Sequence, residues 1–501
     1  MTRSLIIWGT SSGAGKSWLT TALCRVAARR GIDVVPFKAQ NMSNNARVVP
    51  RLDGSLGEIG SAQYFQALAA RVSPMTLMNP VLLKPERDTA SQVVVDGIAD
   101  AALSRLPWRE RSVLLAEHAR AGFEQLAAQH ELIVIEGAGS PAEINLAPQD
   151  YVNLGVARWA QAAGPTAALL VTDIDRGGAF AHVHGTWSLL PDDLRVLLRG
   201  YVLNRFRGDA SLLEPGPQML QAMTGLPLAG VIPLVRGHGL PEEDGLFDNG
   251  LQGGAGDSAA VRLRVAVIAA PHISNLDEFQ PLTRVPGLRL SWARSAAQLE
   301  GADWIILPGS KQVSGDLAWL RAQGLDGVIQ RHAAAGRPLL GICGGLQMLG
   351  RVLHDPAGHD GEPFYGLSGL GVLSLSTRFE DHKRLRAAPV RFASTLGPWA
   401  ALSGITALGY EIRCGSTQAD RQVDSQADTQ HAVLFDTQGQ PIGWQQGSVL
   451  GVYAHGLFEA REVLRALFGA AVPTLDDAFE TLADLAERHL DAALLSRLLG
   501  P

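Results

Sequence analysis

A glycine-rich turn near the start of the chain constrains the fold more than any other sequence feature. Residues 6–20, IIWGTSSGAGKSWLT, run from an apolar strand through this turn into a helix. Such a turn points backbone N–H groups at a polyphosphate, and the helix N-terminus adds the positive end of a dipole. The sequence therefore predicts a phosphate-binding loop for a nucleoside triphosphate. Its predicted nucleotide-binding residues are Gly9, Thr10, Ser11, Ser12, Gly13, Ala14, Gly15, Lys16 and Ser17.

Two side chains and one departure refine this prediction. Lys16 provides a point charge for the phosphates, and the Ser17 hydroxyl is a predicted ligand of Mg²⁺. The leading glycine is Gly9, one position earlier than in the strict Walker pattern, where Thr10 stands. The pattern G-T-x-x-x-x-G-K-S resembles the loop of the dethiobiotin synthetase class of ligases, which implies that ATP activates a carboxyl or carbamate group. A glycine-rich turn without a ligand is the alternative.

Polar residues follow several apolar strands in the first half of the chain. Residues 131–139, ELIVIEGAG, form an apolar strand that ends on Glu136, the second predicted Mg²⁺ ligand. Ligands of doubly wound sheets bind outside the carboxyl ends of strands, so the polar cluster after the strand at 33–38 is a predicted substrate site. A solvated turn explains that cluster equally well. Its candidate residues are Lys38, Gln40, Asn41 and Asn44.

The length and the recurring strand–helix rhythm predict two domains. A chain of 501 residues is too long for one hydrophobic core. Apolar strands alternate with helical segments in both halves, which indicates two doubly wound α/β domains, at residues 1–235 and 262–501. Residues 236–261 are rich in glycine and acidic residues and predict a linker. Residues 462–499 have helical spacing and predict closing helices of the second domain.

Composition favours an enzyme that acts on small molecules. The net charge is −6, and no basic stripe with interleaved aromatic residues indicates nucleic-acid binding. No apolar run is long enough to span a bilayer, and no secretion signal is recognisable, so a cytoplasmic location is expected. Three dispersed cysteines predict neither disulfides nor a zinc site. The oligomeric state stays open, with a homo-oligomer as one option.

The chemistry of the second half is predicted to centre on Cys343. The stretch GICGGLQML places Cys343 between an apolar strand and a helix, which is the sulfur version of a nucleophile elbow. The helix N-terminus stabilises a thiolate, and the N–H groups of Gly344 and Gly309 are predicted oxyanion donors. His455, at the end of another apolar strand, is the predicted base. A buried inert cysteine is the alternative. The glycines on both sides of Cys343 disfavour it, because they are expected to serve no packing purpose.

Several motifs together resemble the cobyric acid synthases, the glutamine-dependent amidotransferases of cobalamin synthesis. Over residues 5–245 they are KAQNMSNN, MNPVLLKP, SQVVVDG, IEGAGSPAEINL, DIDRGGAFAHV, NRFRGD and PEEDG. In the second half, LPGSK, SNLDEF and GYEIRCG resemble the same branch of the class I glutamine amidotransferases. The resemblance implies a P-loop NTPase-like domain, similar to dethiobiotin synthetase, followed by a class I amidotransferase-like domain.

Two positions depart from the class I pattern. Enzymes of this class usually have a glutamate two residues after the histidine, but this chain has Leu457 there, and the nearest acid is Glu459. The third member of the catalytic triad therefore stays open, and its absence is typical of the cobalamin branch. The branch usually has a histidine at the position of Arg413, so Arg413 receives no predicted role. His272 and His382 are weaker candidates for the base.

The resemblance implies a glutamine-hydrolysing carbon–nitrogen ligase that uses ATP, Mg²⁺ and glutamine. Its expected substrate, not cofactor, is a corrinoid, adenosylcobyrinic acid a,c-diamide, amidated at its b, d, e and g carboxylates. Ammonia is expected to travel shielded from water between the two sites. Cobyrinic acid a,c-diamide synthase is the rival in this class, and CTP synthase ranks below it. A MinD-type ATPase switch with an inactive second domain is the alternative of another class, although Ser11 replaces its signature lysine.

Overall fold

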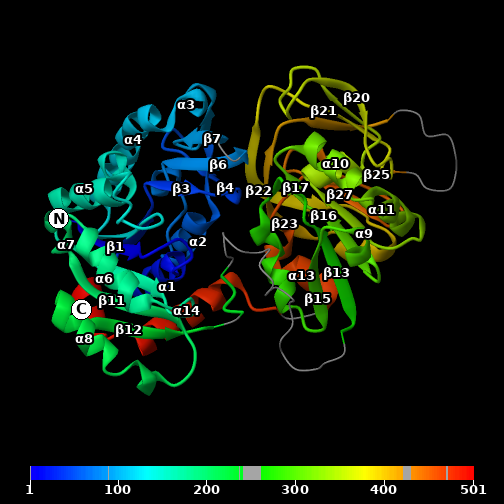
Figure 1. Cartoon of the computed structure of the whole chain (residues 1–501). Helices are drawn as coiled ribbons and strands as arrows, with labels where there is room; N and C mark the ends of the chain where they lie inside the picture. The colour runs from blue at the N-terminus through cyan, green and yellow to red at the C-terminus, as the bar shows by residue number, and fades with distance from the viewer. Residues whose placement is uncertain are drawn as a thin grey trace. The chain divides into compact units, whose positions relative to one another are not determined.

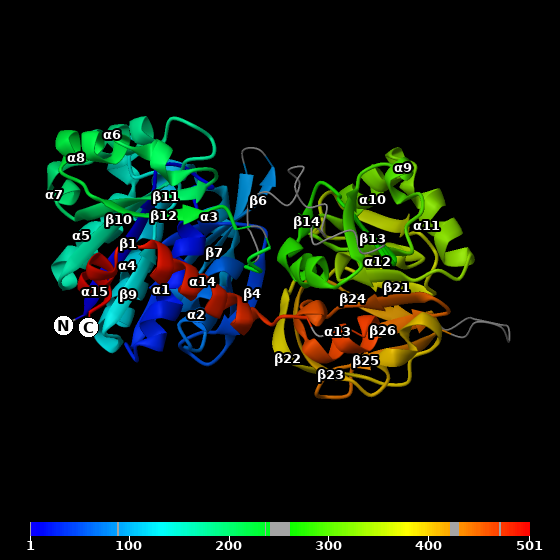
Figure 2. The ribbon, with the colours of Figure 1, turned by 90° about the horizontal axis from the view of Figure 1, so that it is seen from below.

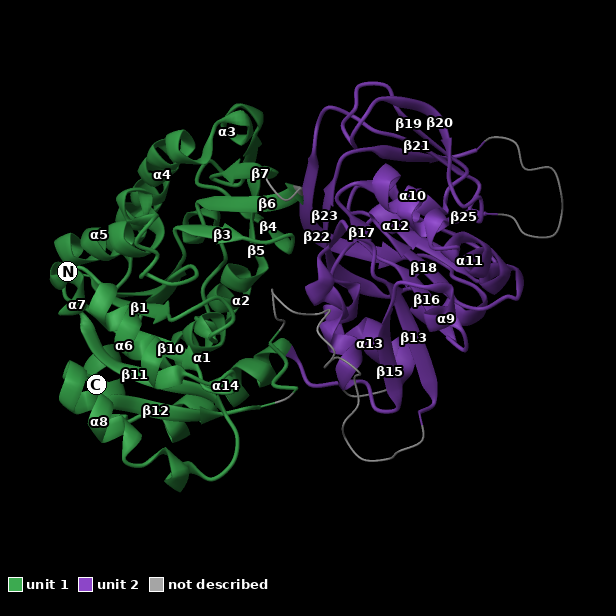
Figure 3. Cartoon of the chain, in the orientation of Figure 1, with its two compact units in different colours: residues 1–240, 475–501 green, residues 241–474 purple. Residues whose placement is uncertain are grey.

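The chain folds into two compact units, which Figure 3 distinguishes by colour. Unit 1 comprises residues 1–240 and 475–501, and unit 2 comprises residues 241–474. The structure, a computed structural model, describes residues 2–87, 90–235, 237–240, 261–420, 430–469 and 472–500. Of the predicted linker, only 237–240 and 261 belong to these residues. The prediction of two α/β domains is confirmed.

A six-stranded parallel sheet forms the centre of unit 1 (Figure 1). The strand order is β12-β11-β10-β1-β9-β2, and all neighbouring pairs are parallel. The central strands are apolar on both faces because helices cover both faces, which is typical of doubly wound sheets. The strands are β1 (Arg3–Gly9), β2 (Val34–Phe37), β9 (Leu132–Glu136), β10 (Thr166–Asp173), β11 (Leu198–Phe206) and β12 (Leu228–Pro233).

Helices cover the two faces of this sheet and divide its core in two. Successive residues of β1 point to opposite faces. Ile6 and Trp8 belong to a core shared with α4, α5, α6 and α8. Leu5 and Ile7 belong to a core shared with α1, α14 (Leu475–His489) and α15 (Ala492–Leu499). The helices are α1 (Lys16–Arg29), α2 (Ser61–Ala69), α3 (Ala101–Arg105), α4 (Trp108–Gln129), α5 (Val156–Ala163), α6 (Ala179–Leu189), α7 (Asp192–Arg195) and α8 (Gly216–Thr224).

Two small sheets follow β2 in the chain and contain two of the four predicted substrate residues, Gln40 and Asn41. One is a four-stranded sheet with the order β3-β6-β7-β8, and the other is the hairpin β4-β5. Their strands are β3 (Gln40–Met42), β4 (Ala46–Pro50), β5 (Leu56–Gly60), β6 (Val81–Arg87), β7 (Ala90–Val95) and β8 (Ile98–Asp100).

The two C-terminal helices belong to unit 1, and the prediction that they close the second domain is wrong. The helices are α14 (Leu475–His489) and α15 (Ala492–Leu499). Their apolar faces share a core with α1, and Figure 2 shows them beside α1. The Arg25 guanidinium, 1% exposed, is bonded to Asp476 and Glu480 of α14. Helical spacing predicted the amphipathic face correctly, but it carries no information about which sheet that face covers.

Truncation of a buried leucine in α14 should therefore destabilise the nucleotide-binding unit. Leu482 is 0% exposed, and Leu482→Ala should lower the free energy of unfolding by about 2–5 kcal/mol. Leu396→Ala is the control, because Leu396 of unit 2 is 57% exposed and its change should stay within about 0.5 kcal/mol. Urea unfolding of each variant, with and without ATP, measures both changes in the free energy of unfolding. Equal losses for the two variants would contradict the assignment of α14.

Unit 2 is built on a nine-stranded mixed sheet. The order is β15-β13-β16-β18-β27-β26-β25-β22-β23. The pairs from β15 to β27 are parallel, and the remaining pairs are antiparallel. The strands are β13 (Leu263–Ile268), β15 (Leu288–Ala293), β16 (Trp304–Leu307), β18 (Leu339–Ile342), β22 (Arg384–Phe392), β23 (Thr406–Arg413), β25 (His431–Phe435), β26 (Pro441–Gln446) and β27 (Val449–Val452).

Smaller elements complete unit 2. A two-stranded ribbon pairs β14 (Ile273–Ser274) with β17 (Gly309–Ser310), and η5 (Leu276–Arg284) follows β14 at once. A four-stranded sheet contains β19 (Val352–Asp355), β20 (Phe364–Ser368), β21 (Leu375–Arg378) and β24 (Ser416–Ala419). The helices are α9 (Ala296–Leu299), α10 (Val313–Ala322), α11 (Leu325–Ala334), α12 (Gly344–Leu349) and α13 (Arg461–Phe468). No helix in the described parts of either unit has the length and apolar character needed to cross a membrane.

Candidate active sites

The glycine-rich turn connects β1 to α1 as the sequence predicted. Gly13 and Gly15 have φ values of 71° and 103°, which other residues adopt only with strain. The Asn204 amide donates a hydrogen bond to the Ala14 carbonyl at 2.9 Å, and a Cβ on Gly15 would lie 1.9 Å from that amide nitrogen. Because position 15 is glycine, the Asn204 side chain of β11 can approach the loop and support its backbone.

The Lys16 ammonium lies over the loop. It donates to the Ser11 carbonyl at 2.9 Å and to the Gly139 carbonyl at 3.0 Å. A Cβ on Gly9 would lie 3.0 Å from Lys16 Nζ, so the absence of a side chain there lets the lysine fold back across the turn. The charge is therefore fixed above the backbone N–H groups that a P-loop uses to bind phosphates.

The two predicted Mg²⁺ ligands lie side by side. The Ser17 hydroxyl donates to Glu136 Oε1 at 2.9 Å, and Glu136 also accepts from Lys38 Nζ at 2.7 Å. Burial by itself raises the pKa of Glu136, but the adjacent Lys38 ammonium outweighs burial and holds that pKa below its ordinary value. The group is therefore a carboxylate. One carboxylate and one hydroxyl fit Mg²⁺ that takes its other ligands from phosphate and water.

No group of three or more His, Cys, Asp or Glu side chains suited to a metal occurs among the residues that the structure describes.

Two of the four predicted substrate residues are buried and the other two are partly buried, which is more burial than a simple solvated turn would give them. Lys38 and Asn41 are both buried, and Lys38 pairs with Glu136. Gln40 accepts a hydrogen bond from the Tyr151 hydroxyl at 2.6 Å. The buried side-chain oxygen of Asn44 has no hydrogen-bond partner in the described structure. Lys38 therefore lies beside the predicted Mg²⁺ ligand, and a role of any of the four in binding the corrinoid stays a prediction.

Because Asn204 supports the loop, its removal should measurably raise the KM for ATP. Asn204→Ala removes the bond to Ala14, so the KM for ATP should rise about tenfold, as expected for one buried hydrogen bond. The matched control is Arg207→Gln, because Arg207 is more than half exposed and pairs with Asp175 at the surface. Steady-state kinetics of ATP hydrolysis measure both variants. An unchanged KM in the first variant would show that the loop does not need this support.

Cys343 occupies a strained turn between β18 and α12. Its φ is +52° and its ψ is −106°, outside the ordinary regions for a residue with a side chain. Strain of this kind is typical of a nucleophile elbow, and Cys343 itself is only 6% exposed. The neighbouring glycines do have a packing purpose, contrary to expectation. A Cβ on Gly345 would lie 2.0 Å from the Leu307 carbonyl oxygen, and one on Gly341 would lie 2.5 Å from Leu349.

His455 has a buried carboxylate partner that the sequence did not identify. His455 Nδ1 lies 2.9 Å from Glu278 Oε1, and the N–H of Gly456 donates to Glu278 Oε2 at 3.1 Å. Burial lowers the pKa of His455, but the charge of Glu278 and a hydrogen bond with Cys343 outweigh burial and raise this pKa to about 10. The geometry therefore assembles a thiol, an imidazole and a carboxylate.

Glu278 is the candidate for the third triad member, which the sequence left open. It lies in η5, 177 residues before the histidine, so no local spacing could pair the two residues. The sequence signal that could have identified Glu278 was the motif SNLDEF, which places carboxylates between apolar residues. These apolar residues, Leu276 and Phe279, are buried in the structure. Leu457, at the position of the usual glutamate, is buried among apolar residues. The weaker base candidates do not form this geometry, because His382 is exposed and His272 pairs with Asp316.

The predicted oxyanion glycines lie next to these groups. A Cβ on Gly309 would lie 2.9 Å from His455 Cε1, and one on Gly344 would lie 2.7 Å from the backbone nitrogen of Ser310. The ribbon of β14 and β17 therefore packs against the start of α12. This arrangement brings all four predicted residues of the second half together, with Tyr410 stacked on the His455 ring at 5.3 Å.

Arg413 is buried beside the same site. Its guanidinium lies 3.8 Å from the centre of the Tyr453 ring, and its Nε donates to Glu411 at 2.8 Å. The Ile412 carbonyl, one residue earlier, lies 3.7 Å from the Cys343 sulfur. Cys24, by contrast, is fully buried in the core of unit 1, and burial raises the pKa of its thiol.

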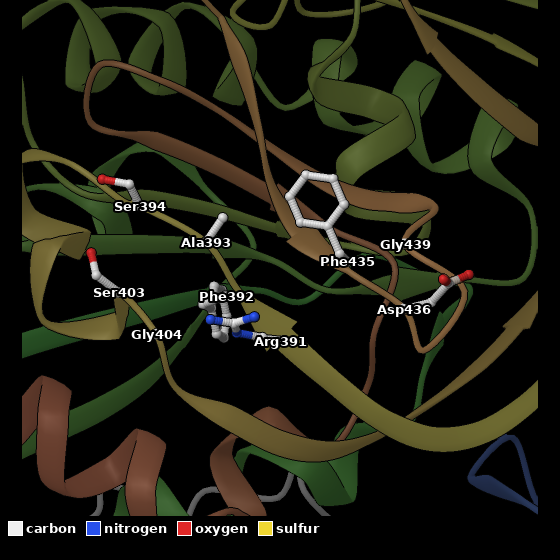
Figure 4. A pocket seen from close by; sticks show the side chains of 9 residues that line it. All are labelled: Arg391, Phe392, Ala393, Ser394, Ser403, Gly404, Phe435, Asp436 and Gly439. Carbon is white, nitrogen blue, oxygen red and sulfur yellow. The ribbon is translucent and has the colours of Figure 1, made fainter.

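A separate open pocket of about 770 Å³ lies elsewhere on unit 2 (Figure 4). None of the predicted site residues lines it. Its lining residues are Arg391, Phe392, Ala393, Ser394, Ser403, Gly404, Phe435, Asp436 and Gly439.

Comparisons with known families agree with both sites. Residues 5–241 match the CobQ/CobB/MinD/ParA nucleotide binding domain, and residues 264–463 match the CobB/CobQ-like glutamine amidotransferase domain. The class of protein is thus a glutamine amidotransferase with a nucleotide-binding domain in the same chain.

Similar proteins narrow this class further. The cobyric acid synthase of Methylibium petroleiphilum is 61% identical over 99% of this chain and 97% of the relative. The cobyric acid synthase of Leptothrix cholodnii is 60% identical over 100% of this chain and 97% of the relative. The cobyric acid synthase of Variovorax paradoxus is 57% identical over 100% of both chains. The chain belongs to the cobyric acid synthase family.

Proposed function

We propose that this protein performs the ATP- and glutamine-dependent amidation of the b, d, e and g carboxylates of adenosylcobyrinic acid a,c-diamide, a step of cobalamin synthesis. The observation that carries the proposal is the presence of two complementary sites in one chain. Unit 2 contains the Cys343, His455 and Glu278 cluster, and unit 1 contains the P-loop. Identity of 57–61% with cobyric acid synthases along the whole chain supports the choice of substrate.

The first half-reaction releases ammonia from glutamine in unit 2. The Cys343 thiolate attacks the side-chain amide carbon, and the amide oxygen becomes an oxyanion near the N–H groups of Gly344 and Gly309. Protonated His455 donates its proton to the amide nitrogen, the C–N bond breaks, and ammonia leaves. Water then hydrolyses the thioester to glutamate and the free thiol. Glu278 holds the imidazole in the orientation that this proton transfer requires.

The second half-reaction activates a carboxylate in unit 1. Transfer of the γ-phosphoryl group of ATP to the substrate carboxylate makes an acyl phosphate, and ammonia then displaces phosphate to form the amide. Lys16 binds and orients the phosphates, and Lys38 offers a second positive charge beside them. Ser17 and Glu136 would hold Mg²⁺, which neutralises phosphate charge when bound.

Mass spectrometry tests the substrate assignment directly. The protein is incubated with ATP, glutamine and the a,c-diamide, and each amide formed lowers the mass by about one unit. Four successive decreases support the proposal. Two decreases starting from unamidated cobyrinic acid would support the rival, cobyrinic acid a,c-diamide synthase, instead.

Glutamate release separates the ligase from an ATPase switch of the MinD type. Both classes share the nucleotide-binding domain that matches here. An inactive second domain would release no glutamate from glutamine, with or without ATP. The strained Cys343 and its buried partners favour the active enzyme. The cytoplasmic location and the oligomeric state stay predictions.

A further inference from the structure

We infer that Asp316 is a positioning residue for glutamine hydrolysis, because it clamps the ribbon from which both the triad carboxylate and an oxyanion donor extend. This inference rests on the proposed glutaminase activity. It also assigns His272 the role of a hydrogen-bond partner that Asp316 holds in place. The sequence offered His272 only as a weak candidate base. The ribbon consists of β14 and β17, residues 273–274 and 309–310.

Asp316 is a completely buried carboxylate on α10 with three hydrogen bonds to the ribbon region. Its Oδ1 accepts from the backbone N–H of His272 at 3.0 Å and lies 2.9 Å from His272 Nδ1. Its Oδ2 accepts from the Ser310 hydroxyl at 2.6 Å. One carboxylate therefore fixes the residue before β14 and the second residue of β17 at the same time.

The ribbon joins this clamp to the reacting groups. Gly309 precedes Ser310, and a Cβ on Gly309 would lie 2.9 Å from the His455 ring. After Ser274, a single residue, Asn275, leads into η5, where Glu278 bonds to His455. The Lys311 N–H also donates to the His272 carbonyl at 2.8 Å, which closes the ribbon next to the clamp.

A buried carboxylate is costly unless its hydrogen bonds are satisfied. Capping the start of α10 does not explain the burial of Asp316. The start of α10 already has a separate carboxylate, because Asp360 accepts from the N–H groups of Val313 and Ser314. Asp316 instead directs both of its oxygens to the ribbon. Since a misplacement of about 1 Å at a reacting centre can cost about 100-fold in rate, this fixation affects catalysis.

The variants Ser310→Ala and Asp316→Asn test the inference, with Asp360→Asn as the matched control. Glutamine hydrolysis by the full chain should lose about 10- to 100-fold in kcat in both test variants, with the KM for glutamine changed less than about threefold. Asp360→Asn removes a buried carboxylate from the same helix start but should keep kcat within about threefold. Circular dichroism and thermal unfolding show that each variant is folded.

Alkylation of Cys343 by iodoacetamide distinguishes positioning from general damage. Alkylation requires the thiolate but no oxyanion donor, so Ser310→Ala should be alkylated within about twofold of the wild-type rate while its kcat falls. Parallel losses of alkylation and kcat, or a kcat unchanged in both test variants, would overturn the inference. A wild-type chain without glutaminase activity would refute the proposed function itself, which is a different outcome.

Discussion

Replacing Cys343 with serine should reduce glutamine-dependent amide formation by at least about 1,000-fold while leaving amidation from ammonium salt intact. Serine is close to cysteine in size, but its hydroxyl is a much weaker nucleophile at neutral pH. The P-loop and its lysines lie in unit 1, so added ammonia still meets an activated carboxylate. Glutamate release and amide formation are measured separately, with glutamine or with ammonium chloride as the nitrogen source.

A second cysteine gives the control for this experiment. Cys414 is only partly buried and has no elbow geometry, so Cys414→Ser should retain glutaminase activity within about threefold. If Cys343→Ser still forms product only with glutamine, or if the wild type forms amide without consuming ATP, the coupling of the two half-reactions is wrong.

Replacing Glu278 with glutamine should lower the kcat of glutamine hydrolysis by about 10³–10⁴-fold. Glutamine keeps an acceptor for the Gly456 N–H, but its neutral amide no longer stabilises the imidazolium of His455 or fixes the orientation of the ring. Loss of an equivalent carboxylate has an effect of about this size in hydrolases with a catalytic triad. Glu459→Gln is the matched control, because Glu459 is the acid nearest to the histidine in the sequence. A loss in the control rather than in Glu278→Gln would contradict the proposed triad.

The same variant should change how stability depends on pH. The pKa of His455 in the folded chain, about 10, is above its ordinary value of 6.5, so the folded state binds this proton more tightly than the unfolded state. The resulting stabilisation is complete below pH 6.5 and is lost as the pH rises through about 10. The difference in free energy of unfolding between wild type and Glu278→Gln should therefore shrink from pH 6.5 to pH 10. Urea unfolding at several pH values measures it, and a constant difference would contradict this linkage.

Local sequence patterns were sufficient to predict the loop and the elbow. Residues 9–17 and the stretch around Cys343 combine a strand, glycines and a helix within a few positions, so their geometry follows from short-range steric rules. Glu136 was also predictable, because the end of a buried parallel strand lies at the ligand-binding edge of the sheet. One argument from the sequence failed. The glycines around Cys343 are needed for packing, as Gly345 against Leu307 shows.

Long-range contacts were beyond such reasoning. The pairing of Glu278 with His455 joins residues 177 positions apart, and the support of the P-loop by Asn204 joins residues 190 positions apart. The helical pattern of residues 475–499 is visible in the sequence, but its docking partner is not. An amphipathic helix specifies only that one face must be covered.

The sequence by itself was enough to predict the candidate chemistry, a thiol nucleophile with a histidine and a phosphate loop with a lysine, because the elbow and the loop require particular residues at fixed short spacings. Only the tertiary structure decided which carboxylate completes the triad, which side chains hold the loop and the ribbon, and to which unit the last two helices belong. These features depend on distances between segments that the chain brings together only when both cores are packed.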